Sequence, residues 1–164
     1  MNTATVAAYI GLGSNLDDPA GQVEAALRAL VRLPHTRLVA RSRLYRTAPW
    51  GDIAQPDFVN AVARLDTGLA AAQLMRALLD IERAAGRVRG VERYGPRVLD
   101  LDLLVFGDQR IDLADLTVPH PRLAERAFVL APLHEIAADL DIPGSGRVDA
   151  LLRRIDTSGV TPLH

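Results

Sequence analysis

The stretch RVLDLDLLVFG, residues 97–107, decides how this chain is expected to fold. Successive side chains of a strand alternate between its two faces, so an extended conformation places on one face Leu99, Leu101, Leu103 and Val105. It places on the opposite face Asp100, Asp102, Leu104 and Phe106. An ionised carboxylate is costly to bury without a partner, so the two acids predict a nearby cation or hydrogen-bond donor.

The segments on either side of this strand predict a split βαβ fold. Residues 5–13 are typical of a buried strand, and Asp17 or Asp18 is expected to cap a helix that begins near Pro19 and ends near Leu33. Residues 36–46 and 57–65 alternate as two strands separated by a long loop. A second helix is expected over residues 69–85, with Gly86 as its stop. A return strand near residues 110–113 then precedes a turn and one or two helices within residues 116–137. The order β-α-β-β-α-β is the split βαβ pattern.

Length and composition indicate one domain, residues 1–164, of an ordinary globular protein. The formal net charge of −1 predicts neither a nucleic acid nor an anionic membrane as partner. Cysteine is absent, which excludes thiolate metal sites, and all 19 basic residues are arginine, which excludes amine chemistry. No apolar run approaches the roughly 18 residues of a membrane span and no leader is evident, so a cytoplasmic location is expected.

Asp100 and Asp102 are candidate metal ligands. Residues i and i+2 of a strand lie roughly 6.6 Å apart on one face, and two carboxylates at that spacing can bracket a pair of hard divalent cations. The alternative is an exposed edge strand whose acids face water, and the two aspartates alone do not exclude it.

A basic segment directly precedes these acids. Five arginines and one glutamate give residues 83–97 a formal charge of +4. The guanidinium of arginine can bind two phosphate oxygens at once, and Mg²⁺ bridges phosphates. The basic segment and the two acids together therefore indicate a site for a polyanion and its metal ions. A solvated loop that pairs with acids elsewhere is the alternative. His120, Arg122 and Arg126 form a second cationic group suited to a triphosphate.

Two further features carry weaker signals. The turn GLGSN, residues 11–15, lacks the third glycine of a dinucleotide fingerprint and the lysine of a P-loop, so a tight turn explains it as well as phosphate binding does. Aromatic residues are scarce, yet Phe58 and Phe128 lie beside polar motifs, where planar rings can enclose a heterocycle. Asn60 can offer an amide to the edge of such a ring.

Four segments together resemble the 6-hydroxymethyl-7,8-dihydropterin pyrophosphokinase family. They are YIGLGSNL (9–16), YRTAPWGDIAQPDFVNA (45–61), ERYGPRVLDLDLLVFG (92–107) and LTVPHPRLAERAFVLAPLHEIA (116–137). The resemblance implies an α/β (α+β), ferredoxin-like fold with a mostly antiparallel sheet and helices packed on it. It also implies transfer of diphosphate from MgATP to the hydroxymethyl group of the pterin, with release of AMP, in folate biosynthesis.

The resemblance also implies roles for individual residues. Two Mg²⁺ ions would be held by Asp100 and Asp102, which with Arg87 and Arg97 make up the implied catalytic set. ATP would be contacted by Glu82, Arg87, Arg97, Leu103, Thr117, His120 and Arg126. The pterin would be contacted by Thr47, Trp50, Phe58, Asn60, Asp100 and Phe128.

Two other classes of protein share parts of this pattern. A split βαβ domain with a basic loop could bind RNA, but such modules stack bases on exposed aromatic residues of the sheet, and here aspartates would repel the phosphates. A metal or nucleotide sensor without catalysis is the second alternative, which turnover would exclude. We therefore expect an enzyme that binds ATP and a pterin, neither nucleic acid nor membrane, and that is a monomer.

Overall fold

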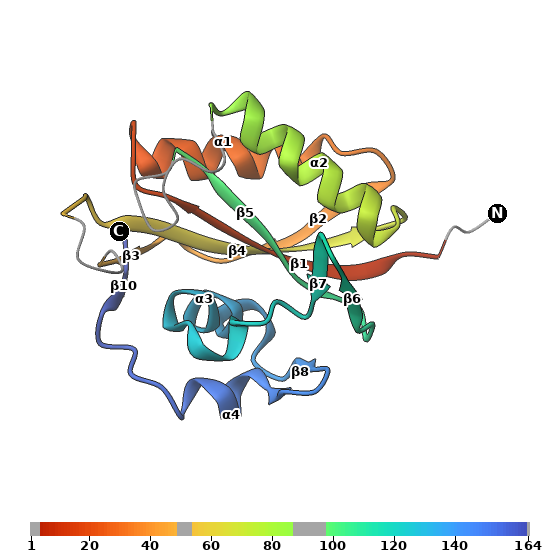
Figure 1. The fold of residues 1–164 in the computed structure, drawn as a ribbon. Helices are drawn as coiled ribbons and strands as arrows, with labels where there is room; N and C mark the ends of the chain where they lie inside the picture. The colour runs from red at the N-terminus through yellow and green to blue at the C-terminus, as the bar shows by residue number, and fades with distance from the viewer. Residues whose placement is uncertain (1–3, 49–53, 87–97, 164) are drawn as a thin grey trace.

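An antiparallel sheet with helices on both faces forms the centre of the protein (Figure 1). The computed structural model describes residues 4–48, 54–86 and 98–163. The main strands are β1 (Val6–Ser14), β2 (Thr36–Arg41), β3 (Tyr45–Thr47), β4 (Phe58–Thr67), β5 (Asp100–Phe106) and β10 (Val160–Pro162). They lie in the order β10-β3-β4-β1-β5, with β2 also paired to β4. Every pairing among these described strands is antiparallel.

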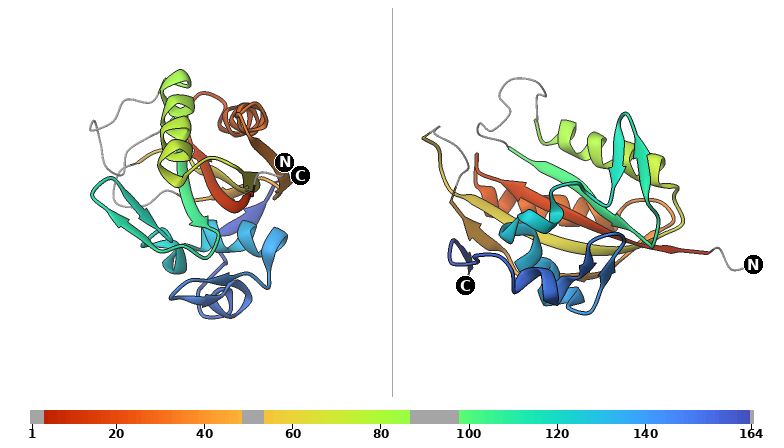
Figure 2. Two further views of the ribbon diagram at one scale, coloured as in Figure 1. Left: turned by 90° about the vertical axis from the view of Figure 1, so that its right-hand side faces the viewer. Right: turned by 60° about the horizontal axis from the view of Figure 1, so that its bottom comes forward.

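The connections between the strands confirm the predicted split βαβ fold. Helix α1 (Pro19–Val31) joins β1 to β2, and β4 lies between these two strands in the sheet. Helix α2 (Ala71–Ala84) joins β4 to β5, with β1 between them. The chain therefore forms two interleaved βαβ units, whose crossovers place α1 and α2 on the same face of the sheet (Figures 1 and 2).

The two predicted helices differ from expectation only at their ends. Asp18, not Asp17, caps α1: its Oδ1 accepts a hydrogen bond from the N–H of Gly21 at 3.3 Å, and Pro19 follows as the first helical residue. Gly86 follows the end of α2 with a φ of +96°, a conformation that glycine adopts without strain. Within the described residues, no helix is long and apolar enough to cross a bilayer.

Each face of the sheet has its own apolar core. Leu27 and Leu30 of α1 and Leu74 and Leu78 of α2 pack on the first face. The second face is covered by α3 (Ala127–Ala137) and α4 (Val148–Leu152), which lie below the sheet in Figure 1. The core on this face includes Tyr9, Val62, Leu104, Val105, Val129, Leu130, Leu133, Val148 and Leu151. The sheet is thus the middle of three layers.

The end of β5 departs from the predicted alternation. Leu103 pairs with Ile10 and Val105 with Tyr9, so Leu104 is an extra residue, a β-bulge. Leu104 and Val105 consequently both pack on the α3 side, whereas Phe106 packs with α1 and α2. The predicted faces of Val105 and Phe106 were therefore wrong, because a bulge reverses the alternation of every residue after it.

Residues 36–46 form two strands, β2 and β3, instead of the single predicted strand. The break falls at Ser42, whose Oγ donates to the carbonyl of Arg43 at 2.7 Å and accepts from the N–H of Val62 at 3.0 Å. A serine side chain thus takes a place that a backbone group would fill in a continuous ladder. Ser42 stands at the inward-facing parity of Leu38, Ala40 and Leu44, so its polar side chain interrupts the apolar face of the predicted strand.

The chain after β5 contains more short strands and helices than the sequence predicted. The predicted return strand is β6 (Ile111–Leu113), and it pairs with β7 (Leu116–Val118), which was not predicted. A 3₁₀ turn (Leu123–Glu125) and α3 follow, and β8 (Asp141–Ile142) pairs with β9 (Gly146–Arg147) before α4 and β10. Strands of two or three residues are too short for periodicity to detect.

Candidate functional site

Strand register brings the predicted polar residues onto the α3 side of the sheet. Tyr45, Asn60, Gly13 and Asp100 are direct partners on four adjacent strands. In the neighbouring row, Gly11 pairs with Val62 and with Asp102. Partners directly across a ladder point to the same face, and Val62 belongs to the α3 core. Asp100, Asp102 and Asn60 therefore share one face, as does Phe58, two residues before Asn60.

Asp102 lies near the start of α3. The side chain of Asp102 is 30% exposed, and its Oδ2 lies 3.9 Å from Nη1 of Arg126, the residue that precedes the helix. An ion pair at this distance is loose, and a carboxylate is a ligand that hard divalent cations prefer. A carboxylate attracts a divalent cation, and a neighbouring guanidinium attracts an anion. The pair of Asp102 and Arg126 is therefore suited to a polyanion that binds together with its cations.

His120 lies beside this pair and is held in a defined orientation. The backbone N–H of His120 donates to the carbonyl of Leu104 at 2.8 Å, and the ring atom Nδ1 accepts from the backbone N–H of Arg122 at 3.2 Å. Burial, reinforced by the positive charge of Arg126, lowers the pKa of His120 to about 4, although Asp100 opposes the shift. At neutral pH the ring is therefore neutral, with the proton on Nε2, where it can donate to a phosphate oxygen.

The depressed pKa of His120 predicts how stability depends on pH. The unfolded state binds a proton near pH 6.5, whereas the folded state resists protonation until about pH 4. The contribution of His120 to the free energy of unfolding is therefore fully present above pH 6.5 and is lost as the pH falls toward 4. We expect the ligand-free protein to lose more stability between pH 7 and 4.5 than its His120→Gln variant, measured by urea denaturation. Parallel pH profiles would contradict this.

Two buried polar side chains lie at the edge of the site near β3. Asn60 is 7% exposed and Thr47 is 9% exposed. Oδ1 of Asn60 and Oγ1 of Thr47 have no hydrogen-bond partner in the part of the chain that the structure describes. Because a buried polar atom without a partner is costly, both atoms are expected to bind a ligand or water.

The GLGSN segment is not the tight turn that was expected, because residues 11–14 are the last residues of β1. Two of its residues have a role that the sequence analysis missed. A Cβ on Gly13 would lie 2.8 Å from Nδ2 of Asn60, so the absence of a side chain there makes room for Asn60. Asn15 is 1% exposed, and its Nδ2 donates to Oε1 of Gln55 at 2.7 Å and to the carbonyl of Pro56 at 3.0 Å. The end of β1 therefore shapes the site, and Asn15 holds the segment that leads to Phe58. Only strand register could have revealed this.

Phe128 lies in the first turn of α3, and the Arg126 guanidinium lies 5.5 Å from the centre of its ring. It belongs to the partly buried residues that border the α3 core. Thr117, on β7, is exposed, and β7 contacts β5. Phe128 thus lies beside Arg126, the ion-pair partner of Asp102, and Thr117 lies on a strand that contacts β5.

Two of the predicted nucleotide ligands have side chains on the opposite side of β5. Leu103 is 3% exposed and packs in the core of α1 and α2. Glu82, in the last turn of α2, is 1% exposed, and its Oε2 accepts a hydrogen bond of 2.7 Å from the N–H of Leu101. This bond holds β5 at the residue between the two aspartates. Trp50, Arg87 and Arg97 lie outside the described residues.

We expect Glu82→Ala to destabilise the protein by about 1–3 kcal/mol, because it leaves the buried N–H of Leu101 without this acceptor. Glu82→Gln keeps an acceptor oxygen and should cost less. The measurement is the urea midpoint of each variant at pH 7. An alanine variant as stable as the wild type would show that the Glu82 bond contributes nothing.

Comparison with known proteins identifies similar chains. The model of the family 7,8-dihydro-6-hydroxymethylpterin-pyrophosphokinase (HPPK) matches residues 9–138. A 2-amino-4-hydroxy-6-hydroxymethyldihydropteridine pyrophosphokinase of Pseudomonas aeruginosa is 51% identical over 155 residues, 94% of this chain and 95% of that protein. The enzyme of the same name from Haemophilus influenzae is 45% identical over 149 residues, 91% of this chain and 92% of that protein.

Solved structures agree with these sequence comparisons at the level of the fold. A structure described as HPPK-DHPS in complex with substrates aligns with a TM-score of 0.78 and 12% identity, covering 99% of this chain and 47% of its own. Plasmodium falciparum HPPK-DHPS A437G with STZ-DHP aligns with a TM-score of 0.72 and 13% identity, covering 93% of this chain and 46% of its own. This chain thus spans less than half of either protein.

Proposed function

The chain belongs to the 7,8-dihydro-6-hydroxymethylpterin-pyrophosphokinase family, and from this premise we propose that it transfers diphosphate from MgATP to 6-hydroxymethyl-7,8-dihydropterin and releases AMP, a step in folate biosynthesis. One observation supports the assignment of this reaction to the site described above. Strand register places Asp100, Asp102 and Asn60 on one face of the sheet, so acids for a metal-bound phosphate lie near an amide for a heterocycle.

The two aspartates fit magnesium. Mg²⁺ takes oxygen ligands, and in nucleotide sites it is bound by one or two carboxylates together with phosphates and water. The described residues hold no group of three or more acidic or histidine side chains suited to a metal, so phosphate oxygens would complete the coordination. We propose that Asp100 and Asp102 hold two Mg²⁺ ions, which when bound neutralise phosphate charge in the transition state.

The nucleotide is proposed to lie along the edge of β5 that faces away from β1. The N–H of Leu101 points away from β1, because it donates to Glu82. By the two-residue period of a strand, the backbone groups of Leu103 face the same way, although its side chain is buried. We propose that this backbone and Thr117 contact the nucleoside. His120 and Arg126 would contact phosphates, and Arg87 and Arg97 would contribute from outside the described residues.

The pterin is proposed to bind between β4 and α3. Phe58 and Phe128 would stack on its two faces, and Oδ1 of Asn60 would accept a hydrogen bond from its edge. Thr47 and Trp50 would add contacts through their main chains. Oδ1 of Asn60, which has no hydrogen-bond partner among the described residues, supports this placement, because an N–H group of a bound heterocycle would satisfy it.

In this proposal the residues of the chain act mainly by orienting the reactants. The hydroxymethyl oxygen of the pterin attacks the β-phosphorus, the bond from that phosphorus to the oxygen bridging to the α-phosphate breaks, and AMP leaves. Asp102 can accept the proton of the hydroxyl group. Arg126 and neutral His120 hold phosphate oxygens in place, so charge and orientation supply most of the rate enhancement.

The arrangement of layers favours this function over RNA binding. Split βαβ modules that bind RNA use exposed aromatic residues on one face of the sheet. Here helices and apolar cores cover both faces. We also propose a monomer, because the large hydrophobic side chains that are exposed among the described residues, Val31, Val39 and Leu113, lie on three separate elements.

The nucleotide product tests the proposed function. The protein is incubated with MgATP, with and without 6-hydroxymethyl-7,8-dihydropterin, and the nucleotides are separated by chromatography. We expect one AMP for each diphosphorylated pterin, and no AMP without pterin. ADP, or a product that does not depend on the pterin, would overturn the proposal, and nucleotide binding without turnover would identify a sensor instead.

A further inference from the structure

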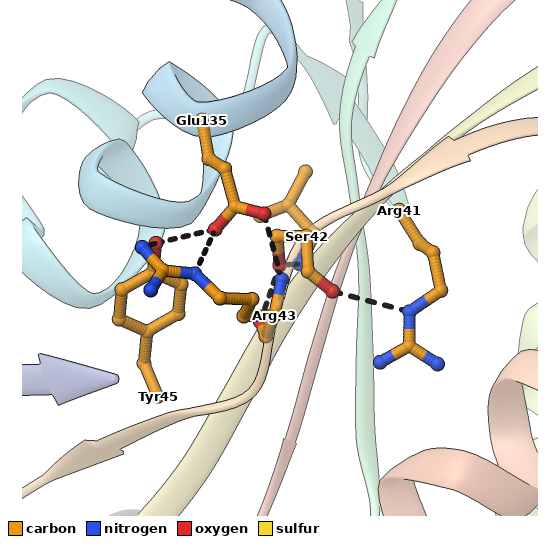
Figure 3. A network of polar contacts seen from close by, with 6 residues as sticks. Arg41, Ser42, Arg43, Tyr45 and Glu135 are labelled. Carbon is orange, nitrogen blue, oxygen red and sulfur yellow. Dashed lines mark hydrogen bonds and ion pairs between the residues drawn. The ribbon is translucent and has the colours of Figure 1, made fainter. Parts of the chain in front are cut away.

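A cluster of polar contacts joins α3 to the β2–β3 segment on the side of the sheet that carries the site (Figure 3). It consists of Arg43, Tyr45 and Glu135, and we call it the Glu135 clamp. Oε1 of Glu135 accepts from the hydroxyl of Tyr45 at 2.5 Å and from Nε of Arg43 at 3.2 Å. Oε2 accepts from the backbone N–H of Arg43 at 3.0 Å. Both carboxylate oxygens thus bind the neighbouring segment.

Charge and burial keep the clamp formed at neutral pH. Burial raises the pKa of Tyr45, and the hydrogen bond to Glu135 raises it further, so the hydroxyl stays protonated and donates. Tyr45 is 6% exposed, whereas the Glu135 side chain is 27% exposed. A partly exposed ion pair contributes little to stability, so variants of Glu135 are expected to remain folded.

The two ends of the clamp each lead to a face of the proposed pterin site. On α3, Glu135 follows Phe128 by seven residues, nearly two helical turns, so the two side chains project from the same side of the helix. On the sheet, Tyr45 is the direct partner of Asn60, and Thr47 is the partner of Phe58.

We propose that Glu135 is a positioning residue that sets the separation between Phe128 and Phe58 and thereby the affinity for the pterin. The proposal rests on the proposed function. A rigid link between α3 and β3 fixes the gap before the pterin arrives, so less ordering is needed on binding. Glu135 itself need not touch either substrate.

The test compares three variants of the clamp with a matched control. Glu135→Ala removes the acceptor of all three bonds, and Tyr45→Phe removes only one hydroxyl. The control is Glu24→Ala, which breaks another partly exposed pair joining a helix to a strand, Glu24 with Arg41 at 2.8 and 3.1 Å. That pair joins α1 to β2, on the side of the sheet away from the Glu135 clamp.

We expect Glu135→Ala to raise the KM for the pterin about tenfold and to change the KM for ATP less than twofold, because only the gap between the rings changes. Tyr45→Phe should also raise the KM for the pterin, but by a smaller factor. Glu135→Gln, which keeps an acceptor oxygen, should restore part of the affinity. Dissociation constants for the pterin, measured with a non-hydrolysable ATP analogue, should follow the same order.

Other outcomes would overturn the inference. If Glu135→Ala and Glu24→Ala change both KM values alike, or if Glu135→Ala lowers stability without changing the pterin KM, Glu135 is only structural. Failure of the proposed function is a separate result, because it would appear in the wild type as the absence of AMP formation that depends on the pterin.

Discussion

Asp102→Asn is expected to lower the rate of AMP formation on the order of 10³-fold or more while the protein stays folded, and Asp100→Asn should do the same. Asparagine keeps the shape of aspartate but removes the charge that would hold Mg²⁺. Asp102 also faces Arg126 at 3.9 Å, so the substitution leaves a positive charge less balanced in the site. The measurement is the initial rate over a range of Mg²⁺ concentrations.

A control separates this effect from a general change in charge. Asp139 is exposed after the end of α3, and Asp139→Asn removes the same charge outside the site. It should leave the rate and its dependence on Mg²⁺ unchanged. Rates near that of the wild type in both Asp100→Asn and Asp102→Asn would exclude the proposed metal ligands.

Gly13→Ala is expected to lower kcat/KM for the pterin on the order of 10²-fold. The added methyl group would lie 2.8 Å from Nδ2 of Asn60, closer than such atoms can approach. Asn60 is 7% exposed and packed within the sheet, so it must rotate or shift, and its Oδ1 would no longer be placed to bind the pterin as proposed. The backbone at Gly13 does not itself require glycine, so the effect is purely steric.

Gly11→Ala provides the matched control on the same strand. Its added Cβ would lie 3.4 Å from Cδ2 of Leu104, which is an ordinary contact with a flexible side chain. We expect at least a tenfold smaller effect than for Gly13→Ala. Measurement of KM for the pterin and for ATP in both variants tests this, and an unchanged pterin KM in Gly13→Ala would show that Asn60 does not bind the pterin.

Local signals in the sequence were sufficient for α1 and α2, for the family and for the placement of the aspartates on one face. Asp18 and Pro19 begin α1 and Gly86 follows α2, because caps depend on the chemistry of adjacent residues. Asp100 and Asp102 share a face because alternation along a strand needs no information from elsewhere. The motifs that resemble the family are likewise contiguous, and the comparisons confirm the family.

Only the tertiary structure decided how these segments meet. The bulge at Leu104 and the break at Ser42 arise from pairing with other strands, so neither follows from the local pattern. The row of Asn60, Gly13 and Asp100 depends on the register of three strands that are distant in the sequence. Glu82 and Glu135 resemble ordinary helical acids until their partners, Leu101 and Tyr45, are known. A sequence specifies local conformation through neighbouring residues, whereas the position of a side chain in a site depends on long-range packing.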